Sequence, residues 1–61
     1  DPSYKGKYEA ALPYLEELTA SKDKENRLNA YELLIQVYGN LGMNDKAMDA
    51  IKMRDELKNQ K

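Results

Sequence analysis

Residues 28–41 read LNAYELLIQVYGNL, a stretch in which apolar side chains dominate. At about 100° per residue of an α-helix, the apolar positions together cover an arc of roughly 220°. A helix with so wide an apolar arc needs partners on two sides, so we predict a middle helix over about residues 25–40, packed between two neighbours. Its apolar positions are Leu28, Ala30, Tyr31, Leu33, Leu34, Ile35, Val37, Tyr38 and Leu41.

Five residues of this middle helix lie outside the apolar arc, on one strip about 100° wide. The strip is the face of the helix with predicted access to solvent or to a partner. A polar strip is also what any helix turns toward water, and both interpretations stay open here. The five partner-binding candidates are Asn29, Glu32, Gln36, Gly39 and Asn40.

The residues before the middle helix predict a first helix over about residues 7–20. Its apolar positions fall within an arc of roughly 120°, which is an ordinary one-sided stripe. Pro13 costs about 3 kcal/mol in a helix interior but little near the first turn. We therefore expect this helix to begin close to Tyr8, with a local distortion or slight kink at Pro13. The stripe consists of Tyr8, Ala11, Leu12, Leu15 and Leu18.

The residues after the middle helix predict a third helix over about residues 45–59. Gly42 is expected to close the preceding helix, and Asn44 is expected to be the N-cap of the third. Met48 and Met53 are expected to flank the inner apolar stripe on either side. That stripe consists of Met43, Ala47, Ala50, Ile51 and Leu57.

A chain of 61 residues makes one small domain, so we predict a single all-α domain over residues 1–61 with three antiparallel helices. A simple three-helix bundle is the alternative arrangement. The chain has no Cys and no His, which excludes thiolate or imidazole metal sites and Cys–His or Ser–His nucleophiles. We accordingly expect no enzymatic activity, no catalytic or metal site and no cofactor.

The charges are balanced and interspersed, with 10 Lys and Arg against 11 Asp and Glu. A nucleic-acid binder normally carries a basic excess, so no nucleic-acid partner is expected. No apolar run approaches the roughly 18 residues of a membrane span, and no signal-peptide pattern opens the chain. We expect a soluble chain without a membrane partner, and the sequence indicates no compartment.

An internal repeat relates the first and third helices. Gly6 and Gly42 are 36 residues apart, as are Ala11 and Ala47. At the same offset, Leu12 matches Met48 and Leu15 matches Ile51. The two helices are therefore expected to occupy equivalent places in a repeated helix–turn–helix unit, with the middle helix between them.

The period and the placement of small residues resemble the tetratricopeptide repeat family. Tyr31, Leu34 and Tyr38 stand where that family favours a large aromatic, a leucine and a tyrosine. Gly42 and Ala47 fall at the family's loop glycine and close-packing alanine. The resemblance covers about one and a half repeats. Within the family, the chain is similar to the C-terminal end of a bacterial member. The resemblance implies that the polar strip of the middle helix lines a groove for a protein or peptide partner.

Several functions follow from these patterns. The resemblance implies a non-catalytic scaffold module for protein–protein interaction, or the C-terminal cap of a solenoid. A purely structural or engineered three-helix domain without a ligand is the alternative. A minor alternative is RNA binding like that of pentatricopeptide repeats, with Tyr31 and Tyr38 stacking on bases, although core packing is the expected role of both. Since about three repeats are usually needed for stability, we also expect weak stability or self-association.

Overall fold

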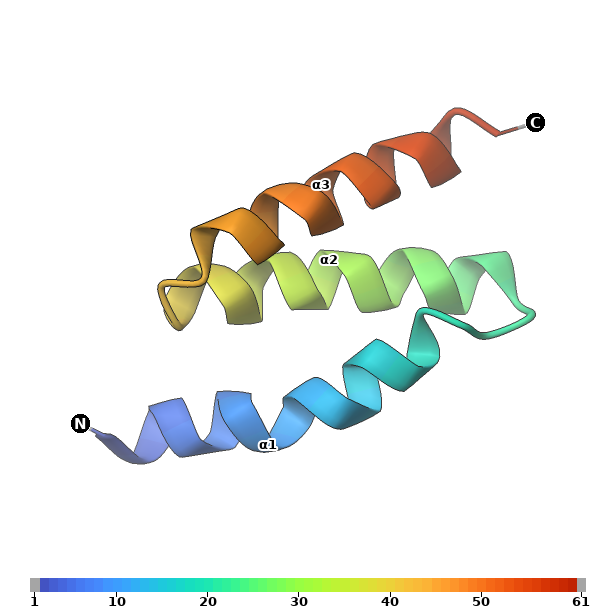
Figure 1. Cartoon of the computed structure of the whole chain (residues 1–61). Coiled ribbons are helices and arrows are strands. Elements are labelled where there is room, and N and C mark those ends of the chain that lie inside the picture. Colours follow the sequence, from blue (N-terminus) through green and yellow to red (C-terminus); the bar gives the residue numbers. More distant parts are fainter. Residues whose placement is uncertain (1, 61) are drawn as a thin grey trace.

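The computed structural model describes residues 2–60, and these residues form three α-helices with no strand. Figure 1 shows α1 (Pro2–Leu18), α2 (Lys24–Asn40) and α3 (Asn44–Lys58) lying side by side, joined by two short turns. The predicted all-α fold is confirmed. The bounds predicted for α2 and α3 are correct to within one residue.

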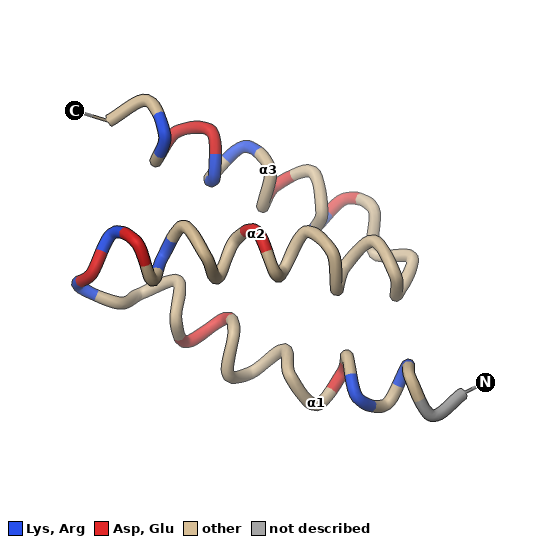
Figure 2. Tube along the Cα trace, turned by 180° about the vertical axis from the view of Figure 1, so that it is seen from behind, with Lys and Arg blue, Asp and Glu red and all other residues tan. Residues whose placement is uncertain are grey.

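The three helices form an open layer with α2 in the middle (Figures 1 and 2). Both α1 and α3 pack against α2, whereas among the described residues no Cα atom of α1 lies within 8 Å of one in α3. The Cα trace measures 42 × 20 × 12 Å, and its small third dimension is that of a single layer of helices. The layer thus differs from a closed bundle, in which each helix packs against both others.

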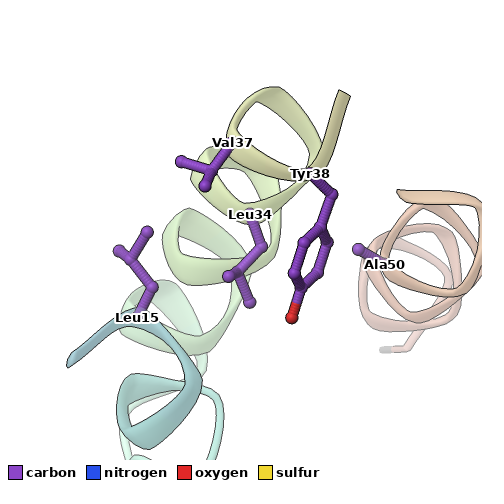
Figure 3. Packing of buried hydrophobic residues seen from close by; sticks show 5 residues of the cluster. All are labelled: Leu15, Leu34, Val37, Tyr38 and Ala50. Atoms are coloured by element: carbon purple, nitrogen blue, oxygen red, sulfur yellow. The ribbon is translucent and has the colours of Figure 1, made fainter. Parts of the chain in front are cut away.

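The core follows the line along which α2 meets its neighbours. Leu15 of α1 points toward Leu34 and Val37 of α2, and the ring of Tyr38 lies beside Ala50 of α3 (Figure 3). Because Ala50 is small, it leaves room for the Tyr38 ring between α2 and α3 (Figure 3). The apolar arc of α2 is therefore divided between two partners, as its width predicted.

The first helix begins at Pro2, so the prediction that it begins close to Tyr8 is wrong. Proline is favoured in the first turn of a helix, where its missing N–H has no bond to lose. The rings of Tyr4 and Tyr8 meet edge to face, with 5.9 Å between their centroids. Because they lie one turn apart, this contact stabilises the part of the helix before Tyr8. Gly6 therefore lies inside the helix and does not interrupt it.

Pro13 lies inside α1, and Figure 1 shows the helix bending in its middle, where the ribbon passes from blue toward cyan. A proline in a helix interior removes one backbone hydrogen bond and commonly bends the helix. The helix ends at Leu18, two residues before the predicted end. Thr19 and Ala20 continue the chain in tighter turns, with Thr19 N–H donating to the Glu16 carbonyl at 3.3 Å.

The turn between α1 and α2 is held by side chains. Asp23 caps α2, and its carboxylate accepts a hydrogen bond from the Glu25 N–H at 2.9 Å. The Arg27 guanidinium donates to the Ser21 carbonyl at 2.6 Å and to the Lys22 carbonyl at 3.1 Å. These bonds fix the angle at which α2 leaves α1.

The turn between α2 and α3 is a Schellman motif closed by Gly42, whose φ is +75°. The Met43 N–H donates to the Tyr38 carbonyl at 2.8 Å, and the Gly42 N–H donates to the Gly39 carbonyl at 3.2 Å. The predicted role of Gly42 is confirmed. The N-cap of α3 is Met43 and not Asn44, because the helix begins one residue earlier than expected and Asn44 is its first residue.

Two residues assigned to the core from the sequence are exposed in the structure. Leu33 of α2 is 47 % exposed, and Ile51 of α3 is 36 % exposed. The arc of α2 is wider than the surface that two neighbouring helices cover, so Leu33 at its edge remains in solvent. Ile51 is uncovered because α3 has one packing partner, α2, among the described helices.

Candidate partner-binding surface

The five strip residues lie on the part of α2 that neither neighbouring helix covers. Four of them are exposed, and Glu32 is partly buried at the edge facing α3. The prediction did not include the ion pair between Glu32 and Lys58, whose Nζ lies 3.9 Å from a Glu32 carboxylate oxygen. We call the five residues the α2 strip: Asn29, Glu32, Gln36, Gly39 and Asn40.

Contacts at its C-terminal end give the α2 strip a defined shape. The Asn40 side-chain amide donates to the Gln36 carbonyl at 2.8 Å, which holds that side chain against the last turn of α2. Gly39 leaves open space where a side chain would stand, because a Cβ there would meet no atom within 4 Å. A partner can therefore approach the backbone of α2 closely at Gly39.

Leu33 is a part of this surface that the sequence reasoning assigned to the core. It lies four residues after Asn29 and three before Gln36, so these three side chains are neighbours on one face of α2. The surface accordingly combines polar side chains with an exposed leucine, and such a combination is typical of contact surfaces. The position of Leu33 at the edge of the apolar arc was the available signal.

Charge is sparse along this face. From Leu28 to Asn40 the one charged residue is Glu32, and Figure 2 shows it as a single red segment in the middle of α2. Its carboxylate is already paired with Lys58, and an ion pair this open to solvent contributes about 1 kcal/mol or less. A cation of a bound partner can therefore replace Lys58 beside Glu32 at little cost in free energy.

A concavity separate from the α2 strip is lined by side chains from all three helices. It has a volume of about 260 Å³, and the Tyr38 hydroxyl donates to the Glu16 carboxylate at 2.8 Å across it. The Lys46 ammonium lies 5.9 Å from the centroid of the Tyr38 ring. Burial, this hydrogen bond and the Glu16 charge raise the pKa of Tyr38 to about 12. Its lining residues are Glu16, Thr19, Tyr31, Leu34, Tyr38, Lys46, Asp49, Ala50 and Met53.

The tyrosines considered for base stacking pack with the core. Tyr38 is 7 % exposed, and Tyr31 is partly buried against the same cluster. Both rings therefore contribute to the packing between the helices, which is the role expected for them from the sequence.

The described residues contain no group of three or more Asp and Glu side chains placed to hold a metal ion. Within the same residues, no helix combines the length and the apolar character that a membrane crossing needs. No family model, no curated protein and no solved structure matches the chain.

Proposed function

We propose that this chain is a non-catalytic protein-interaction module that binds a segment of another protein along the α2 strip. The observation that carries the proposal is the open face of α2, where Leu33 stands exposed among the polar strip residues. A helix packed on both sides presents such a face rigidly, so a bound segment loses little of its affinity to ordering the receptor.

The chemistry of the strip favours a polar or basic segment with one apolar side chain. Leu33 offers contact to the apolar side chain, and Glu32 offers its carboxylate to a cation. The amides of Asn29 and Gln36 can donate to and accept from an extended backbone.

The structure favours an internal scaffold module over a C-terminal cap. Terminal repeats of a solenoid need a polar outer face. The outer face of α3 instead carries Met48, which is 68 % exposed, and Ile51. A structural domain without a ligand remains the alternative, and RNA binding has less support because Tyr31 and Tyr38 pack in the core.

The test begins with peptides selected on the wild-type chain from a displayed random library. A variant with both Glu32→Lys and Gln36→Ala is expected to bind the selected peptides at least tenfold more weakly, measured by titration calorimetry. Its melting temperature is expected to stay within about 2 °C, because both side chains are at the surface.

Two matched variants separate binding from stability. Glu56→Lys makes the same charge change on an exposed position of α3 and is expected to leave affinity unchanged. Glu32→Lys combined with Lys58→Glu restores the ion pair with its charges exchanged, and we expect binding to remain weak. Equal affinity in the Glu32→Lys/Gln36→Ala variant would show that the strip is not the site.

A further inference from the structure

The face of α3 that points away from α2 carries uncovered apolar side chains. Met48 is 68 % exposed and Ile51 is 36 % exposed, and they lie three residues apart on adjoining parts of the helix. Their neighbour Lys52 is also exposed. Apolar side chains on a helix are normally buried against another element, so this pair is a surface on which a further element can pack.

The internal repeat indicates which kind of group covers them. At the offset of 36 residues, Met48 corresponds to Leu12 and Ile51 corresponds to Leu15. Leu15 is 5 % exposed and Leu12 is packed against the core, and both are covered by α2. Two equivalent pairs of side chains therefore differ: the pair on α1 is covered by a helix, whereas the pair on α3 is exposed to solvent.

We propose that the outer face of α3 is a docking site for a separate amphipathic helix whose apolar face resembles that of α2. On α1, Leu15 packs against Leu34 and Val37 of α2 (Figure 3). The docked helix is therefore expected to carry a leucine and a valine with the same spacing of three residues, to pack against Ile51. It also carries a small residue four positions before the leucine, where α2 has the fully buried Ala30. This site is distinct from the α2 strip and does not depend on it.

Arg54 does not block this face. It corresponds to Leu18 at the same offset, and its guanidinium is turned to the Asp55 carboxylate at 3.2 Å. Its side chain is 29 % exposed, and its aliphatic part can pack beside a docked helix while the charge stays in water.

The first experiment titrates the ¹⁵N-labelled 61-residue chain with a synthetic peptide of residues 24–41. We expect shift changes centred on Met48 and Ile51. Met48→Glu is expected to weaken binding at least tenfold, whereas the control Lys22→Glu, at an exposed position in the turn before α2, changes it less than twofold. A peptide carrying Leu34→Asp is expected not to bind.

The second experiment removes the dependence on a weak, free peptide. A chain in which a second copy of residues 19–61 follows Asn59 presents the same helix at high effective concentration. In this tandem chain, Met48→Glu is expected to lower the melting temperature by at least 5 °C. In the 61-residue chain the same change is expected to lower it by less than 2 °C, because Met48 is exposed there.

Several results would overturn the proposal. Equal effects of Met48→Glu in the tandem and single chains would show that no helix docks on α3. Peptide shifts confined to α1 would show exchange with the chain's own α2. A dimer of the 61-residue chain that dissociates on Met48→Glu would assign this face to a second copy instead.

Discussion

Tyr38 is the residue whose side chain connects all three helices. It belongs to α2, its hydroxyl donates to Glu16 of α1 at 2.8 Å, and Lys46 of α3 lies over its ring. Since α1 and α3 do not pack on each other, this side chain is a principal link between them. Within residues 4–60, its hydroxyl is also the donor of the one side-chain hydrogen bond between α1 and α2.

The raised pKa of Tyr38 predicts a loss of stability at alkaline pH. Its pKa is about 12 in the folded chain and about 10 in an unfolded one, so folding favours the protonated phenol. The stabilisation is fully present below pH 10 and is lost as the pH rises through 12. We expect a decrease of about 1–2 kcal/mol in the free energy of unfolding over that window, after allowance for solvent in the open cleft.

Urea unfolding at several pH values between 8 and 12 measures this decrease. Tyr38→Phe should flatten the part of the profile due to Tyr38 and should cost about 1 kcal/mol at neutral pH through the lost hydrogen bond. Tyr14→Phe is the matched control, since Tyr14 is exposed. An identical alkaline decrease in wild type and Tyr38→Phe would contradict the assignment.

At the scale of the element, adjacent leucines on α2 have opposite environments. Leu34 is 3 % exposed in the core, and Leu33 is 47 % exposed on the open face. We expect Leu34→Ala to cost about 2–4 kcal/mol, which is enough to unfold most of a small domain. Leu33→Ala is expected to change the free energy of unfolding by less than about 0.5 kcal/mol.

Chemical denaturation of both variants measures the contrast. The same two substitutions also separate packing from binding, because Leu33→Ala should weaken a partner bound on the α2 strip. Similar losses of stability in both variants would mean that α2 is covered on the strip side too.

The elements differ in how well the sequence predicted them. The middle position of α2 followed from the width of its apolar arc, and the turn at Gly42 followed from the need for a positive φ. The start of α1 did not, because Pro2 and Gly6 are read as breakers, whereas a first-turn proline favours a helix. Leu33 and Ile51 were misplaced because angular arithmetic on one helix does not fix the directions from which its neighbours approach.

The candidate surface was likewise predictable only where local pattern determines it. The five strip residues follow from polarity and period alone. The ion pair of Glu32 with Lys58 joins residues 26 positions apart, and no local pattern specifies such a contact. The bond between Tyr38 and Glu16 likewise depends on how α1 packs against α2.

At the scale of the whole molecule, the small core limits stability. The described residues include seven buried apolar side chains, and a chain of this length buries only about 60 % of its unfolded surface. We expect a free energy of unfolding of a few kcal/mol, or self-association that covers exposed apolar groups. Sedimentation and thermal melting at several concentrations measure both, and a monomer with a high melting temperature throughout would contradict this expectation.

The layered order of the helices also bears on how fast the chain folds. Over residues 2–60, helices pack only on their neighbours in the sequence, so no contact between helices has to close the long loop that a packed α1–α3 pair would require. Folding rates rise as the mean sequence separation of contacts falls, and helical proteins of this kind fold in microseconds to milliseconds. The hairpin of α2 and α3, whose mutual packing is the more extensive, is then the natural nucleus onto which α1 adds.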